Sequence, residues 1–171
     1  MSNWINPRIK WLAYGLELFV LYIIQTTPNL LPGFLGVKPL LLVVAAISIS
    51  MFEGEGAGMW IGLAAGLLMD MSAGGVFGFN GLMLMIICYI SGALVVYLMR
   101  NNIVSAMVLG IAGLLLLGLV RWFFFYVMWS DPKIWYHLYA FMLPQIIYTA
   151  ATMPIAFFFN RSVATHLTVE D

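Results

Sequence analysis

Long apolar segments occupy nearly the whole chain, and this pattern limits the available folds more than any other feature of the sequence. Of the 171 residues, 64% are hydrophobic and only 8% are charged, whereas about a quarter of the residues in a soluble domain are charged. A helix needs about 20 apolar residues to cross a bilayer. The sequence therefore predicts an all-α integral membrane protein with six transmembrane helices in a single polytopic domain, residues 1–171. The expected spans are residues 11–31, 39–52, 53–71, 81–99, 103–129 and 134–159.

Basic residues in the short connections predict the orientation, because Lys and Arg accumulate on the cytoplasmic side of a membrane. With six spans, both termini lie on one side of the membrane. Basic residues are then more numerous on that side, so we expect both termini in the cytoplasm. The residues compared are Arg8, Lys10, Arg100 and Arg161 on the side of the termini, against Lys38 and Lys133 on the other.

A regular series of small residues crosses the third segment. Glycine recurs at every fourth position there, and the same step then leads to one acidic residue and a further glycine. A step of four turns a helix by about 400°, so the series forms one slowly winding stripe. Such a stripe lets a second helix approach closely, and that helix belongs either to this chain or to a partner. This glycine stripe, the candidate packing or docking surface, comprises Gly58, Gly62, Gly66, Asp70, Gly74 and Gly78.

Two opposite charges lie inside apolar segments at similar expected depths. Asp70 stands near the outer end of the third segment, and Arg121 near the outer end of the fifth. Because an isolated charge inside a membrane is costly, the sequence predicts an intramembrane ion pair between Asp70 and Arg121. The alternative is that each side chain reaches the outer interface separately.

Other polar residues of the spans have structural interpretations. Glu17 in the first segment is expected to bond a neighbouring helix, together with Gln25, or to lie protonated in the bundle. Glu53 and Glu55 are expected to place negative charge at a helix N-terminus. The hydroxyl groups inside the spans favour bonds between helices over nucleophilic roles. These hydroxyl residues are Ser48, Ser50, Ser91, Thr149 and Thr152.

The chain has no recognisable catalytic or metal-binding pattern. His137 and His166 are far apart and have no second ligand at a suitable spacing, so we expect no metal site. No hydrolase, zinc-protease or phosphate-loop motif occurs, so we expect neither a cofactor nor an enzyme. A second class of function stays open, because Asp70, Arg121 and Gln145 could line a small-solute pocket between the third, fifth and sixth segments.

Residues 62–94, GLAAGLLMDMSAGGVFGFNGLMLMIICYISGAL, resemble the signature of the MreD family of rod shape-determining membrane proteins. The family pattern is a glycine-bearing helix ending in G-L-L-x-D, which residues 66–70 match. Glycines at suitable positions follow in the connection, including Gly81 before the next span. Residues 143–161, LPQIIYTAATMPIAFFFNR, resemble the last span of the family. The acidic EGEG at residues 53–56 departs from the family pattern.

The resemblance implies a non-enzymatic component, or scaffold, of the cell-wall elongation machinery (elongasome) in the bacterial cytoplasmic (inner) membrane. Its expected partners are MreC, the peptidoglycan polymerase RodA with a class B penicillin-binding protein, and indirectly MreB, but not nucleic acid. The fold is expected to resemble the substrate-binding subunit of energy-coupling-factor transporters. The alternative function, from the candidate pocket described above, is a small-solute-binding membrane subunit of a transporter.

Overall fold

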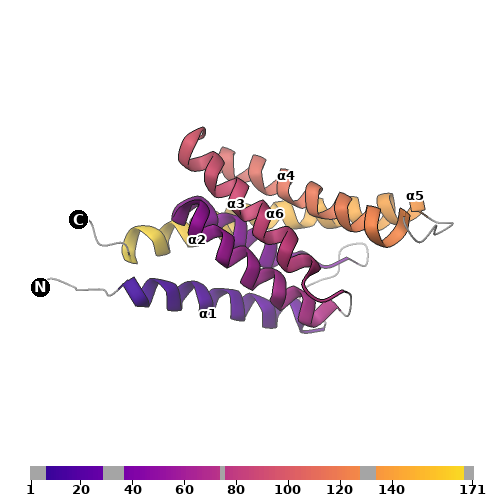
Figure 1. The fold of residues 1–171 in the computed structure, drawn as a ribbon, viewed down its shortest axis with the longest axis horizontal. Helices are drawn as coiled ribbons and strands as arrows, with labels where there is room; N and C mark the ends of the chain where they lie inside the picture. The colour runs from indigo at the N-terminus through magenta and orange to yellow at the C-terminus, as the bar shows by residue number, and fades with distance from the viewer. Residues whose placement is uncertain (1–6, 29–36, 74–75, 128–133, 168–171) are drawn as a thin grey trace, which may run out of the picture.

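The computed structural model describes residues 7–28, 37–73, 76–127 and 134–167. These residues form an elongated bundle whose helices run roughly along one axis (Figure 1). The described part contains helices and no strand, which confirms the predicted all-α class there. The elements are α1 (Pro7–Thr26), α2 (Leu41–Ala73), α3 (Phe79–Tyr97), α4 (Ile103–Trp122), the π-helical η1 (Phe123–Val127), α5 (Ile134–His137), the π-helical η2 (Leu138–Met142) and α6 (Leu143–Leu167).

Five helical stretches in the described residues are long and apolar enough to cross a membrane. The sequence predicted six, and the difference arises in α2. That element joins residues 39–52 and 53–71, which were predicted as two separate spans. The five stretches are Ile9–Thr26, Leu41–Ser72, Phe79–Tyr97, Ile103–Phe125 and Leu138–Thr165.

A sharp bend at Gly54 divides α2. Gly54 has φ 82° and ψ −176°, a backbone conformation that only glycine adopts readily. A Cβ built on Gly58 would lie 2.5 Å from Cβ of Ser50. Eight residues of a straight helix would separate these positions by about 12 Å. The two halves of α2 therefore fold back on each other around Gly54. The residue range of each half nearly coincides with one of the two predicted segments.

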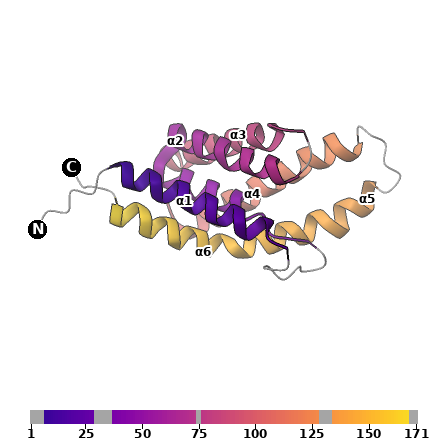
Figure 2. The ribbon, with the colours of Figure 1, turned by 90° about the horizontal axis from the view of Figure 1, so that it is seen from below.

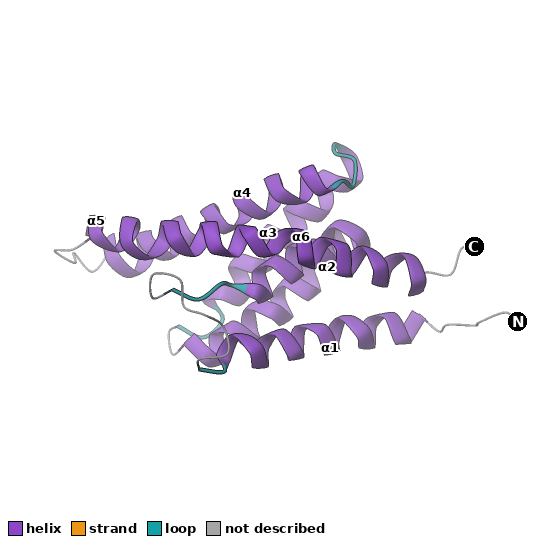
Figure 3. Ribbon diagram, turned by 180° about the vertical axis from the view of Figure 1, so that it is seen from behind, coloured by secondary structure: helices purple, strands orange, loops and turns teal. Residues whose placement is uncertain are grey.

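The two ends of the described chain lie at the same end of the bundle, where α1 begins and α6 ends (Figure 1). Helices α1 and α6 run side by side there (Figure 2). Viewed from behind, α1 follows one edge of the bundle, away from α4 (Figure 3).

The core of the bundle is built around α2. In the apolar stretch of α2, 61% of the residues are buried, against 11% in the apolar stretch of α1. Helix α2 is therefore the central element and α1 a peripheral one. Residues 42–51 are all buried, and Leu84 and Ile87 of α3, Leu117 of α4 and Phe157 of α6 belong to the same core. Burial on all sides explains why the sequence of this first half of α2 has no polar face.

Candidate functional site: glycine contacts and buried polar groups

The helical part of the glycine stripe lies against α3 of the same chain. A Cβ on Gly62 would lie 2.5 Å from the carbonyl oxygen of Leu84 and 2.9 Å from Cβ of Cys88. A Cβ on Gly58 would lie 3.2 Å from the carbonyl oxygen of Cys88. These glycines are buried, so the stripe packs backbone against backbone inside the protein.

The contact continues along both helices in steps of about four residues. A Cβ on Gly66 would clash with the carbonyl oxygen of Asn80, and one on Gly92 would lie 2.7 Å from the carbonyl carbon of Gly54. Gly81 belongs to the same contact, since the Cα of Gly81 lies 2.5 Å from the Cβ position of Gly66. Glycines of α3 therefore meet glycines of α2, a pairing that the spacing of the glycines in the third segment did not predict.

The remaining members of the stripe have different positions. Gly74 lies outside the described residues. Gly78 precedes α3 with φ 92°, and a Cβ there would meet no atom within 4 Å. Its role is conformational, because the chain enters α3 through a left-handed turn.

Asp70 caps the N-terminus of α3. Its carboxylate accepts hydrogen bonds from the backbone N–H of Gly78 at 2.9 Å, of Asn80 at 3.3 Å and of Gly81 at 3.2 Å. It also accepts one from the side-chain Nδ2 of Asn80 at 2.7 Å. The first N–H groups of a helix have no partner within the helix, and negative charge is favourable there. The buried acid at the end of α2 thereby fixes the start of α3.

The structure does not bring Asp70 and Arg121 together as a pair. All the interactions of the Asp70 carboxylate in the described part of the chain are with residues 78–81. Backbone N–H groups satisfy this carboxylate, so it needs no guanidinium. Arg121 lies in the last turn of α4 and lines a separate pocket.

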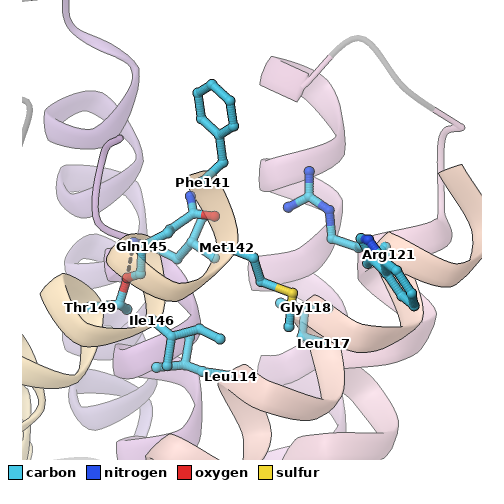
Figure 4. Close-up of a pocket in the computed structure, with 11 residues that line it drawn as sticks. Leu114, Leu117, Gly118, Arg121, Phe141, Met142, Gln145, Ile146 and Thr149 are labelled. Atoms are coloured by element: carbon cyan, nitrogen blue, oxygen red, sulfur yellow. Dashed lines mark hydrogen bonds between the residues drawn. The ribbon is translucent and has the colours of Figure 1, made fainter. Parts of the chain in front are cut away.

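That pocket lies between α4, η2, the start of α6 and the residue preceding α2, and has a volume of about 110 Å³ (Figure 4). Its polar groups include Arg121 and Gln145, two of the three residues considered for a solute pocket. Gln145 donates from Nε2 to the carbonyl oxygen of Lys38 at 3.1 Å, and Thr149 accepts a bond from the N–H of Leu40 at 3.0 Å. Apolar side chains form the rest of the wall, namely Leu40, Leu114, Leu117, Trp122, Phe141, Met142 and Ile146.

Polar side chains attach α1 to the bundle. Glu53 of α2 pairs with Nζ of Lys10 at 2.6 Å and accepts a hydrogen bond from the Tyr14 hydroxyl at 2.8 Å. Oε1 of Glu17 accepts a hydrogen bond from Nδ2 of Asn160 in α6 at 3.1 Å. Oε1 of Gln25 accepts a hydrogen bond from the N–H of Leu42 at 3.2 Å.

The predicted structural role of Glu17 and Gln25 is confirmed, because each bonds a neighbouring helix. The sequence did not predict Tyr14 as a partner of Glu53 or Asn160 as a partner of Glu17. Tyr14 could have been found, since it continues the spacing of Lys10, Glu17 and Gln25 along one face of a helix. Asn160 carries no comparable signal, because it is one amide among aromatic residues near the end of the last span.

The other predicted polar residues divide into two groups, apart from Ser91, which is buried in α3. Ser48 donates to the carbonyl oxygen of Ala156 in α6 at 3.3 Å, and Thr149 bonds the N–H of Leu40, so both make the expected contacts between segments. Ser50 and Thr152 instead bond carbonyl groups of their own helices. The side chains of His137 and His166 lie outside the described residues.

Glu53 and Glu55 lie where the second half of α2 begins, which is the helix N-terminus at which negative charge was expected. Both flank the bend at Gly54 and are held by side chains. Glu53 is bound by α1 residues, and Glu55 accepts a hydrogen bond from the Tyr97 hydroxyl of α3 at 3.1 Å. The acidic residues thus tie neighbouring helices to the turn of α2. Within the described residues, no cluster of three His, Cys, Asp or Glu side chains could hold a metal ion.

These observations define a multi-pass helical membrane protein whose polar groups join its own helices. The sequence matches the family of the rod shape-determining protein MreD over residues 8–160. The chain belongs to the MreD family, which confirms the resemblance found in the sequence. No curated protein and no solved structure matches the chain.

Proposed function

We propose that this protein is a non-enzymatic component of the bacterial cell-wall elongation complex and binds MreC within the cytoplasmic membrane. Membership of the MreD family, over residues 8–160, carries this proposal. The described residues form one helical bundle, so a partner with a single span must contact the lateral surface of this bundle. RodA, a class B penicillin-binding protein and, indirectly, MreB are the further partners of this proposal.

The proposed topology has six passes with both termini in the cytoplasm. The bend at Gly54 supports two passes from α2, because its halves fold back on each other. The first half, residues 41–53, spans only about 20 Å of the roughly 30 Å hydrocarbon core. It is surrounded by protein, so it need not match the bilayer. An even number of passes also agrees with the position of both ends of the described chain at one end of the bundle.

The partner surface is proposed to lie outside the glycine stripe, since α3 already covers Gly58, Gly62 and Gly66. The outer face of α1 is a testable candidate. Leu12 and Leu16 are exposed there, and a Cβ on Gly15 would meet no atom within 4 Å. A partner helix can approach most closely where the side chain is smallest.

Co-purification with MreC after joint expression tests the proposed function. We expect MreC to be retained by the wild-type protein, and a paired ATPase of a transporter not to be. Gly15→Leu is expected to fold and insert, and loss of MreC from this variant would locate the contact on α1. Retention of MreC would place it on another face, whereas absence of MreC from the wild-type complex would contradict the function.

The alternative, a small-solute-binding transporter subunit, is favoured by the pocket that contains Arg121 and Gln145. For that function, a solute should co-purify with the protein and depend on both side chains. Mass spectrometry of the purified protein would detect such a solute. If the solute still binds after both Arg121→Gln and Gln145→Leu, this pocket is not its binding site.

A further inference from the structure

Two buried oxygen atoms lack a hydrogen-bond partner where α1 meets α6. They are Oε2 of Glu17 and Oδ1 of Asn160, and Asn160 is completely buried. The same two side chains are already joined, because Nδ2 of Asn160 donates to Oε1 of Glu17 at 3.1 Å. Buried polar atoms are nearly always paired, so this pair of empty acceptors requires an explanation.

The missing donor cannot come from Asn160 itself. Its amide has two N–H groups, and Nδ2 bonds both Oε1 of Glu17 and the carbonyl oxygen of Ala156, the latter at 3.0 Å. Exchanging the amide oxygen and nitrogen would break both bonds. An ionised carboxylate has only acceptors, whereas a protonated carboxyl group has one O–H donor. A single proton on Glu17 would therefore supply the donor that Oδ1 of Asn160 lacks.

The charged groups nearby do not compensate a negative charge on Glu17. On α1, Lys10 pairs with Glu53 of α2, and the Tyr14 hydroxyl bonds the same Glu53. On α6, Arg161 is exposed next to Asn160. Among the described residues, Glu17 has no ion-pair partner. A carboxylate inside a span without a cation is strongly disfavoured, which favours the neutral form.

We propose that Glu17 is a proton-binding site. The protonated Glu17 and Asn160 form a two-bonded pair of carboxylic acid and amide that holds α1 against α6. Loss of the proton places a negative charge beside the Asn160 oxygen and weakens this contact. The middle of α1 thus responds to proton concentration, whereas the ion pair between Lys10 and Glu53 holds the start of the same helix without that response.

Labelling with dicyclohexylcarbodiimide tests the proton directly. This apolar reagent reacts with protonated carboxyl groups in apolar surroundings, and peptide mass spectrometry identifies the modified residue. We expect labelling of Glu17 at neutral pH in the full-length protein in lipid nanodiscs, with loss of labelling as the pH rises. Glu53, which forms an ion pair with Lys10, is expected to stay unlabelled and serves as an internal control.

Absence of labelling at Glu17 across the pH range would overturn the proposal, because the carboxylate would then be ionised and satisfied by water. Protection of Glu17 by sodium ions at constant pH would also overturn it. That result would mean that a metal cation, and not a proton, joins the two oxygens.

Thermal unfolding as a function of pH provides a second readout. The folded wild-type protein holds the proton, so its midpoint should be highest at acidic pH and fall as the pH rises. Glu17→Gln keeps a donor and an acceptor and should abolish this slope while retaining the midpoint at neutral pH. Glu53→Gln breaks an ionised pair, and should lower the midpoint while leaving the slope. An unchanged slope in Glu17→Gln would contradict the proposal.

Discussion

The contact between α2 and α3 and the attachment of α1 use opposite means of holding helices together. Glycines of α2 and α3 let the two backbones touch, and one buried acid closes the end of the contact. Helix α1 buries little of its surface and is fixed by side-chain bonds from Lys10, Tyr14, Glu17 and Gln25. Lipid is as apolar as a leucine side chain, so apolar area alone gives little drive for helix association in a membrane.

The two contacts should therefore respond differently to substitution. A backbone contact has no room for added atoms, and its neighbours are carbonyl groups that cannot rotate away. A set of separate polar bonds loses one member at a time, at about 0.5–1.5 kcal/mol for an ordinary hydrogen bond. We expect substitutions in the first contact to affect the whole fold, and substitutions in the second to loosen α1 locally.

The largest effect is expected for Gly62→Leu. Its Cβ alone would lie 2.5 Å from the Leu84 carbonyl oxygen, so α2 and α3 must separate. Overpacking of this kind costs about 1–3 kcal/mol and sometimes more, and separation of two backbones belongs at the upper end. Thermal unfolding in detergent measures the loss, and Gly15→Leu is the matched control because its site is open. Equal stability of the two variants would contradict the importance of the glycine contact.

A smaller loss is expected for Asp70→Asn. The amide group presents an N–H donor to a site that contains four donors from residues 78–81. Leaving buried donors unpaired costs about 1–3 kcal/mol, and the start of α3 should lose protection in hydrogen exchange. Combination with Arg121→Gln tests the predicted ion pair. We expect the two losses to add, whereas a double variant more stable than Asp70→Asn alone would reveal coupling between the charges.

The contrast between the contacts also explains what could be predicted from the sequence. The spacing of Gly58, Gly62 and Gly66 depends only on helix geometry, so the close-packed surface could be located. The helix that covers this surface could not be predicted, because the bend at Gly54 and the position of α3 against α2 depend on tertiary packing. For Asp70, charge and depth suggested a charged partner. The backbone N–H groups that bind it belong to Gly78 and to the first turn of α3, which the chain enters through the left-handed Gly78.

The smallest effect is expected for Gln25→Leu near the C-terminal end of α1. This substitution removes one hydrogen bond, the one that Oε1 accepts from the N–H of Leu42 at 3.2 Å. That N–H lies in the first turn of α2, where it has no partner within the helix. We expect a loss of about 0.5–1.5 kcal/mol and faster hydrogen exchange near Leu42, with the α2–α3 contact unchanged. If protection is lost equally along α3, the two contacts form one cooperative unit, and the distinction between close packing and separate polar attachment does not hold.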